Sequence, residues 1–156
     1  MLQRLATFTC AAAFAAIAIY ISIVEQPSRL LLDDRAQLLQ WAASYPPAMK
    51  IQSALAVLAG LSAIWIWFRS RTLLWLIGAV LMLANWPYTL LVLNPVNHAL
   101  MTMASSTTGE TSRALVEQWG WLHAIRSLLG LTSAVLFAVV LIRDVGRENM
   151  VPIRAA

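Results

Sequence analysis

The feature that most constrains this chain is a series of long stretches without charged side chains. Residues 5–24, 51–68 and 72–93 contain no side chain that is charged at neutral pH, and residues 127–142 form a fourth such stretch. An α-helix rises 1.5 Å per residue, so about 20 residues cross a hydrocarbon core roughly 30 Å thick. We therefore expect an all-α integral membrane protein whose four helices form an antiparallel bundle. The expected spans, in a single domain 1–156, are residues 5–24, 49–68, 72–93 and 119–142.

The overall composition agrees with a membrane protein. Hydrophobic residues make up 60% of the 156 positions and charged residues only 12%, whereas about a quarter of a soluble domain is charged. A soluble enzyme is therefore excluded. We also expect no nucleic-acid partner, because the arginines stand singly or in pairs at the ends of apolar stretches and form no basic run. The single cysteine, Cys10, excludes an intramolecular disulfide.

The segments beside the apolar stretches predict further helical structure. Residues 25–48 carry apolar side chains at near-helical spacing, which predicts a short amphipathic helix on the outer membrane surface between spans one and two. Pro87 predicts a kink in span three. Residues 127–142 are too few to cross the bilayer, so we expect the fourth helix to begin well before them.

The distribution of Lys and Arg predicts the orientation of the bundle. With the amino terminus in the cytoplasm, the cytoplasmic side holds Arg4, Arg69, Arg71, Arg143, Arg147 and Arg154. The opposite side holds Arg29, Arg35, Lys50, Arg113 and Arg126, of which Lys50 and Arg126 are expected within helices. Because Lys and Arg are enriched in cytoplasmic loops, we expect both termini in the cytoplasm and the protein in a bacterial inner membrane.

Polar side chains collect at the expected outer ends of all four spans. Trp119, His123 and Arg126 follow i, i+4, i+7 spacing and so share one face of the fourth helix. Ionisable groups at membrane depth are costly and usually face a bundle interior or a water-filled cavity. We therefore expect one outward-facing polar pocket. The other spans contribute to it Glu25 and Gln26, Lys50 and Gln52, and Asn85 with Asn94–His98.

The combination of His123 and Arg126 is suited to catalysis. A neutral histidine accepts a proton near neutral pH, and an arginine one turn away stabilises a developing oxyanion. Such a pair suits proton abstraction from an acidic C–H bond or a phenol. A simpler interpretation is that Lys50 and Arg126 extend to lipid headgroups and that Glu25 pairs with one of them.

A metal site is a further alternative. His98, Met101 and Met103 form a soft-ligand cluster that could bind cuprous copper, and His123 could join it. The simpler interpretation is that the methionines fill gaps in the packing. Haem ligation by His98 and His123 is disfavoured, because both lie near the expected outer surface. We therefore expect no metal.

Three blocks of the chain, in this order, carry a resemblance to a known family. They are Tyr20–Leu30 (YISIVEQPSRL), Trp86–Leu100 (WPYTLLVLNPVNHAL) and Trp119–Gly130 (WGWLHAIRSLLG), with Trp41 and the Ser44, Tyr45 region between the first two. In these blocks the chain resembles the anthrone-oxygenase-like family of small four-helix membrane proteins. The resemblance implies oxidation of a tricyclic anthrone to a quinone by dioxygen, without an evident cofactor.

The resemblance also implies roles for residues of the pocket. His123 is the expected base and Arg126 the partner of the oxyanion. Asn97 and Glu25 are expected to orient the reacting groups. The residues expected to contact substrate are Trp119, Trp86, Tyr20 and His98.

These roles define the expected partners and the alternative. The expected ligand is a hydrophobic small molecule, membrane lipid surrounds the bundle, and a homo-oligomer is one assembly that the chain could form. The competing interpretation is a non-catalytic membrane protein that binds lipid or quinone, or that supports a partner complex.

Overall fold

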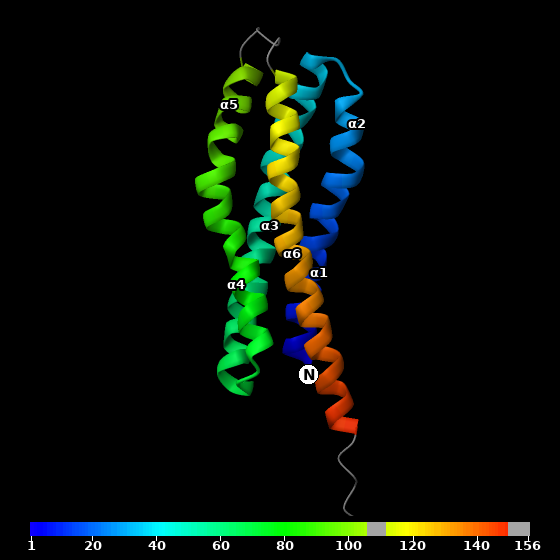
Figure 1. Ribbon diagram of the computed structural model, residues 1–156, viewed down its shortest axis with the longest axis vertical. Coiled ribbons are helices and arrows are strands. Elements are labelled where there is room, and N and C mark those ends of the chain that lie inside the picture. Colours follow the sequence, from blue (N-terminus) through cyan, green and yellow to red (C-terminus); the bar gives the residue numbers. More distant parts are fainter. Residues whose placement is uncertain (106–111, 150–156) are drawn as a thin grey trace, which may run out of the picture.

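The computed structural model describes residues 1–105 and 112–149, and these residues form four long helical segments that alternate in direction (Figure 1). The first and third segments are each interrupted by a π-helical turn. In chain order the elements are α1 (Leu2–Tyr20), η1 (Ile21–Glu25), α2 (Gln26–Leu30), α3 (Asp34–Ser70), α4 (Leu73–Tyr88), η2 (Thr89–Leu93), α5 (Asn94–Ser105) and α6 (Ser112–Asn149).

All four segments are long and apolar enough to cross a membrane. They are Leu2–Leu30, Asp34–Ser70, Leu73–Ser105 and Ser112–Gly146, and the described residues contain no strand. The expected all-α membrane bundle is therefore confirmed. The fourth helix begins at Ser112, fifteen residues before its uncharged stretch, as its short apolar part required. Where the hydrocarbon core begins and ends on each helix stays a prediction.

The expected amphipathic helix between the first two spans is not a separate element. Residues 34–70 form one continuous helix, α3, which runs through Pro46 and Pro47. Leu38 and Trp41 are fully buried against residues of α5 and α6, so this part of the chain lies in the bundle rather than on the membrane surface. At 1.5 Å per residue a helix of 37 residues is about 56 Å long, so α3 extends beyond the hydrocarbon core.

The two π-helical turns lie beside prolines. Pro87, the site of the expected kink, lies in the last turn of α4, and the π-helical turn η2 follows it at Thr89–Leu93. The other turn, η1, spans Ile21–Glu25 and precedes Pro27. A π turn inserts an extra residue into a helix and is frequent at functional sites. Here both turns change which side chains the first and third segments direct into the bundle.

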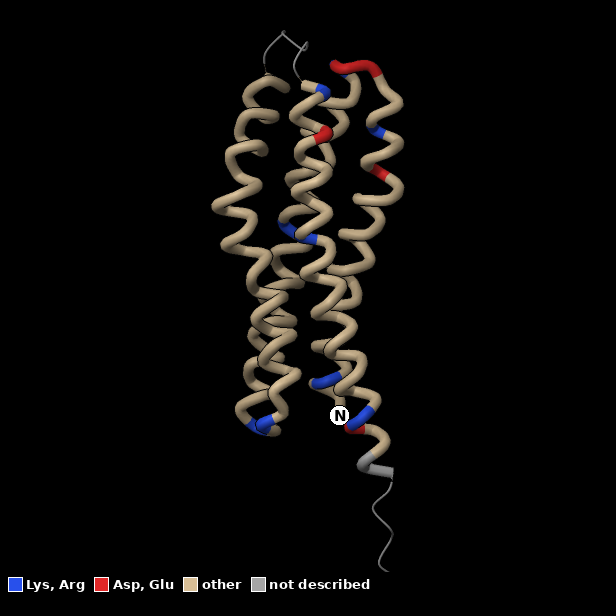
Figure 2. Tube along the Cα trace, in the orientation of Figure 1, with Lys and Arg blue, Asp and Glu red and all other residues tan. Residues whose placement is uncertain are grey.

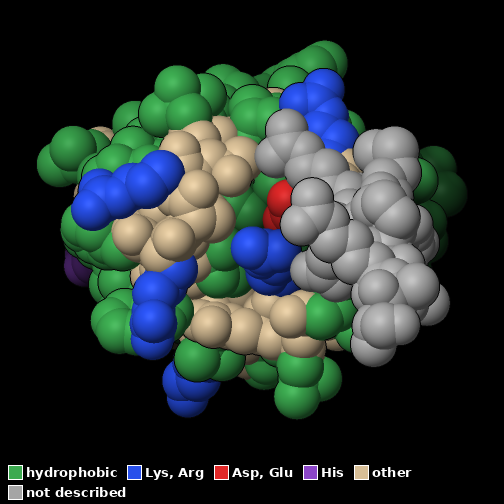
Figure 3. All heavy atoms as spheres, turned by 90° about the horizontal axis from the view of Figure 1, so that it is seen from below, with side chains coloured by type: hydrophobic (Ala, Val, Ile, Leu, Met, Phe, Trp, Pro, Cys, Tyr) green, Lys and Arg blue, Asp and Glu red, His purple; other side chains and the backbone are tan. Residues whose placement is uncertain are grey.

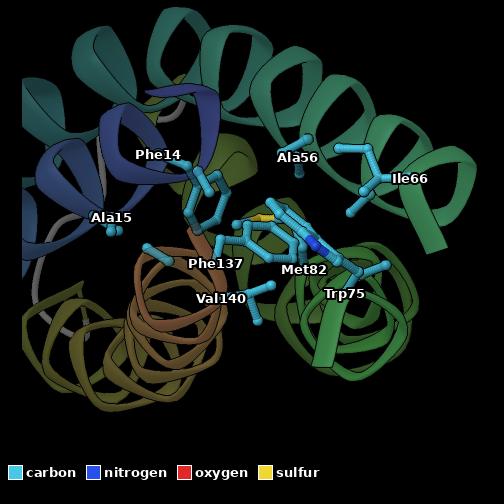
Figure 4. Packing of buried hydrophobic residues seen from close by; sticks show 14 residues of the cluster. Phe14, Ala15, Ala56, Ile66, Trp75, Met82, Phe137 and Val140 are labelled. Atoms are coloured by element: carbon cyan, nitrogen blue, oxygen red, sulfur yellow. The ribbon is translucent and has the colours of Figure 1, made fainter. Parts of the chain in front are cut away.

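The half of the bundle that holds the N terminus is closed by a dry hydrophobic core. Figure 4 shows this cluster, in which Phe14, Trp75, Met82 and Phe137 from three helices point toward one another. Phe137 stacks on Trp75 with ring centroids 5.1 Å apart. A Cβ on Gly78 would lie 2.3 Å from the Phe137 ring, so the helices approach closely only because this position has no side chain.

The two ends of the bundle differ in charge. The N terminus and the end of α6 lie together at one end (Figure 1). Lys and Arg side chains surround this end when it is viewed directly (Figure 3), whereas most Asp and Glu residues lie toward the other end (Figure 2). Arg4 pairs with Asp144 across α1 and α6, with Nη1 and Oδ2 3.1 Å apart. This asymmetry matches the one that the sequence predicts.

Candidate active site

A small cavity lies inside the half of the bundle remote from the N terminus. Its volume is close to that of one water molecule, and side chains from the first segment, α3 and α6 enclose it. The lining residues are Ile21, Glu25, Arg29, Ser44, Tyr45, Ala48, Met49, Gln52, Trp119, His123 and Arg126. Three of the four expected catalytic residues thus face one space.

His123 is oriented by two serine hydroxyls. Its Nδ1 lies 3.2 Å from the Ser22 Oγ and 3.4 Å from the Ser127 Oγ, and the two hydroxyl oxygens are 2.9 Å apart. The Ser127 hydroxyl also reaches two backbone carbonyls, those of Ala18 at 3.2 Å and His123 at 3.0 Å. The hydroxyls and the ring nitrogen can each donate or accept, whereas a carbonyl only accepts; an arrangement that satisfies these contacts has Ser127 donating to a carbonyl, Ser22 donating to Ser127, and His123 donating from Nδ1 to Ser22. This chain of donors leaves Nε2 of His123 unprotonated and able to act as a base.

The ring of His123 is also fixed by stacking. The Trp119 indole lies against it with ring centroids 4.8 Å apart and an angle of 23° between the planes. His123 itself is 2% exposed. The imidazole is therefore held in one place by a ring on its face and by hydroxyls at one edge, as a pre-organised base requires.

Arg126 is buried without a counter-charge. Its residue is 4% exposed, its Nε has no hydrogen-bond partner, and no carboxylate of the described residues pairs with it. Its guanidinium carbon lies 5.5 Å from the centre of the Phe14 ring. The expectation that Arg126 extends to lipid headgroups is therefore wrong. An unpaired cation at membrane depth is costly and marks a functional site.

Arg29 is the ion-pair partner of Glu25, whose partner the sequence alone did not determine. Its Nη2 donates to Glu25 Oε1 at 2.6 Å and to Ser44 Oγ at 3.0 Å. Its Nη1 donates to Gln26 Oε1 at 2.6 Å, and its Nε donates to Gln40. Glu25 also accepts from Gln40 Nε2 at 3.1 Å. Glu25 therefore neutralises Arg29, not Lys50 or Arg126.

Asn97 does not line the cavity but forms hydrogen bonds with two residues that do. Its Oδ1 accepts from Trp119 Nε1 at 2.9 Å, and its Nδ2 donates to the Tyr45 hydroxyl at 2.8 Å. Tyr45 in turn donates to the Met49 sulfur at 3.0 Å and stacks on Trp41 with ring centroids 4.8 Å apart. Asn97 thus positions two of the aromatic walls rather than facing the cavity itself.

A second cavity adjoins the first. It has a volume of about 150 Å³ and lies between α3 and the junction of α4 with η2. Arg126 and Met49 line both cavities and therefore form the partition between them. The remaining lining residues are Ser53, Ala56, Asn85, Trp86, Thr89 and Leu90.

The structure places the eight expected site residues in four groups. His123, Arg126, Glu25 and Trp119 line the first cavity, and Trp86 lines the second. Asn97 contacts the wall of the first cavity. Tyr20 is 57% exposed and His98 is also exposed, and neither lines either cavity. The geometry therefore gives these two residues no part in the site.

The positions of the described residues do not support the copper alternative. His98 and Met101 lie exposed on α5. Across residues 1–105 and 112–149, no three His, Cys, Asp or Glu side chains come together as a group that could hold a metal ion.

Several site residues carried no assigned role in the sequence. Ser22, Ser127 and Thr89 are small residues within apolar stretches, and Tyr45 lies in the segment between the first two stretches, where it entered only through the family resemblance. The pairing of Arg29 with Glu25 could have been predicted from the sequence, because the two residues stand four apart on a helix and such pairs meet on one face.

Comparison with known proteins places the chain among anthrone oxygenases. The family model described as anthrone oxygenase matches residues 36–136. The anthrone oxygenase nsrD of Aspergillus novofumigatus is 34% identical over 130 residues, which cover 72% of this chain and 76% of that protein. An anthrone oxygenase of Claviceps purpurea is 34% identical over 111 residues, which cover 62% of this chain and 63% of that protein. No solved structure matches the chain.

The pairing of Glu25 with Arg29 predicts a specific stability effect. Glu25→Gln removes the charge partner of an arginine whose side chain is 1% exposed, and loss of one partner from a buried pair costs about 3 kcal/mol. We expect a clear fall in the midpoint of thermal unfolding in detergent.

Asp34→Asn is the matched control, because Asp34 pairs with Arg113 at the surface, where both side chains are about 40% exposed. Its effect should stay below about 1 kcal/mol. Equal shifts for the two variants would contradict the assigned pairing.

Proposed function

Because the chain belongs to the anthrone oxygenase family, we propose that it oxidises an anthrone, or a closely related hydrophobic aromatic ketone, to the quinone with dioxygen. The observation that supports this proposal most is the unpaired guanidinium of Arg126 beside the oriented imidazole of His123. A base and a cation in one water-poor site suit a reaction that creates an anion on a hydrophobic molecule.

The first step is proton transfer. His123 Nε2 removes one proton from the CH₂ group opposite the anthrone carbonyl, and the electron pair moves into the ring system as an enolate. Arg126 stabilises the negative charge on the enolate oxygen. Trp119, held by Asn97, forms an aromatic wall beside the imidazole.

The second step consumes dioxygen. The enolate carbon gives two electrons to dioxygen as a C–O bond forms, and the peroxide takes the proton back from His123 to give a hydroperoxide. The remaining hydrogen on that carbon then leaves as a proton while the O–O bond breaks. The carbon becomes the second carbonyl, and hydroxide with the proton leaves as water. The substrate loses two hydrogens and gains one oxygen atom, and dioxygen supplies the other oxygen to water.

The base is tested by removing its imidazole. We expect His123→Ala to lower kcat for anthrone oxidation by about 10²–10⁴-fold, measured as quinone formation above the rate in protein-free detergent. His98→Ala is the control, because His98 is the other histidine of the chain and lies outside both cavities. Unchanged rates in His123→Ala would end the proposal.

The role of Arg126 predicts opposite changes in activity and stability. Arg126→Met removes the oxyanion partner and should lower kcat by about 10²–10³-fold. The same change removes an unpaired buried charge, so thermal stability should rise by about 1–3 kcal/mol.

Arg29→Met provides the contrast. It removes an arginine that has a carboxylate partner, and it should destabilise the protein by leaving Glu25 unpaired. Loss of stability in Arg126→Met would show that this arginine has a structural partner after all.

A non-catalytic binding protein is the second candidate, because a ligand held in the second cavity would reach His123 only if the first cavity widened. A space for one water molecule does not admit a tricyclic ligand. A protein of this kind would bind a quinone but would not accelerate its formation, so the same assay separates the two candidates.

For localisation, we propose that both termini face the cytoplasm. The end of the bundle that holds the N terminus and the end of α6 carries Arg4, Arg69, Arg71 and Arg143 against Asp144 among the described residues, as the enrichment of basic residues in cytoplasmic loops favours. The relatives reported above come from fungi, and they give no support to the bacterial inner membrane expected from the sequence.

Orientation is tested by labelling engineered cysteines with a membrane-impermeant maleimide in intact cells. Ser70→Cys, at the end of α3 beside the N terminus, should be protected until the membrane is opened. Asp33→Cys, at the opposite end, should react at once. The reverse pattern would invert the topology.

A further inference from the structure

The second cavity has the dimensions of a pocket for one aromatic ring. Its volume of about 150 Å³ equals that of an engineered protein cavity that binds benzene (about 150 Å³). Its apolar walls come from Met49 and Ala56 on α3 and from Trp86 and Leu90 on the third segment. A larger polycyclic molecule could place one ring inside while its other rings extend through the mouth.

The mouth of this cavity faces the lipid. Trp86 and Leu90 line it and are also 44% and 57% exposed on the outside of the bundle. Thr89 stands sixteen residues after Leu73, where α4 begins, which is about 24 Å along the helix at 1.5 Å per residue. With span three beginning at residue 72, as the sequence predicts, the opening is expected within a hydrocarbon core roughly 30 Å thick, at the depth of the acyl chains, where a hydrophobic aromatic molecule accumulates.

Three of the residues that line this cavity each carry a buried polar atom without a hydrogen-bond partner. These atoms are Asn85 Oδ1, Thr89 Oγ1 and Arg126 Nε. Asn85 is 1% exposed, and its Nδ2 already donates to the carbonyls of Leu81 and Met82. Its Oδ1, which can only accept a hydrogen bond, therefore has no donor. Each buried polar group without a partner costs about 1–3 kcal/mol, so three around one cavity indicate a ligand with matching polar groups.

The position of Thr89 has a local cause. It is the first residue of the π-helical turn η2, which follows Pro87. Thr89 stands four residues after Asn85, so the two side chains lie on the same face of the helix and line the same cavity.

We propose that this cavity is a lateral portal through which a hydroxylated polycyclic aromatic molecule passes from the lipid to the site of His123. Asn85 Oδ1 accepts a hydrogen bond from a phenolic hydroxyl, and the Thr89 hydroxyl makes a second hydrogen bond to the same ring. Arg126 lies between the two cavities and binds an oxygen atom of the bound ring system. That the ligand is a substrate rests on the proposed function. That the portal binds it does not depend on that function.

The portal is tested first with ligands that the protein does not oxidise. Binding of 2-hydroxyanthraquinone and of anthraquinone is measured by tryptophan fluorescence in lipid nanodiscs, at mildly acidic pH so that the phenol keeps its proton. We expect the wild type to bind the hydroxylated ligand about tenfold more tightly, as one hydrogen bond of about 1.4 kcal/mol provides. Asn85→Leu should abolish this preference and keep the affinity for anthraquinone.

Thr89→Val should reduce the same preference, and Thr9→Val is its matched control. Thr9 lies exposed on α1, where its hydroxyl bonds only to the Leu5 carbonyl. In the oxidation assay Asn85→Leu should raise KM for hydroxylated anthrones with little change in kcat. A preference that survives in both Asn85→Leu and Thr89→Val would overturn the proposal, because the unpartnered atoms would then be satisfied by water.

The route is tested by blocking each candidate opening. Ser53→Phe fills the portal and should abolish both binding and oxidation. The other large groove, between the first segment and α6, has a volume of about 380 Å³ and is lined in part by Ala124. Ala124→Phe fills that groove and should leave binding unchanged. The reverse result would place the route in that groove, and circular dichroism of each variant checks that the helices are intact.

These outcomes separate the portal from the proposed function. A wild type that prefers the hydroxylated quinone but never oxidises an anthrone would contradict the function and keep the portal. If the wild type oxidises anthrones, and if Ser53→Phe and Asn85→Leu behave like the wild type, the portal alone is contradicted.

Discussion

Burial of the Arg126 guanidinium in a medium of low dielectric constant is the constraint on which the site depends. A cation at membrane depth is normally paired or hydrated, yet the only described carboxylate near this site, that of Glu25, is bound to Arg29. The cation is therefore available to a ligand, and its attraction for an anion is strong because little water screens it. A site of this kind costs stability in the free protein and recovers it when an oxyanion forms.

The rest of the outer half of the bundle can be understood as support for this arrangement. Arg29 joins the first segment to α3 through Gln40 and Ser44, and so fixes the carboxylate away from Arg126. Ser22 and Ser127 determine which nitrogen of His123 carries the proton. The dry core at the other end of the bundle (Figure 4) supplies the rigidity that holds these groups in place.

The helices could be predicted because bilayer thickness dictates the length of each apolar stretch, and the shared cavity of Glu25, Trp119, His123 and Arg126 followed from helical spacing and topology. The contacts of Arg29 with α3 could not be predicted, since they depend on how the first segment packs against that helix. The continuity of α3 could not be predicted from the amphipathic pattern of residues 25–48, because the same pattern fits a surface helix and a helix whose Leu38 and Trp41 are buried in the bundle. Thr89 and Asn85 are four residues apart and so share one helix face, but the cavity that they line depends on how the third segment packs against α3.

The central claim is that His123 creates an anion and Arg126 stabilises it before dioxygen reacts. Rapid mixing of the protein with an anthrone in the absence of oxygen tests it directly, with the enolate followed by its absorbance. The account predicts that bound enolate accumulates in the wild type, persists until oxygen is admitted and then decays to quinone. Full turnover in air by a protein that forms no enolate under anaerobic conditions would contradict it.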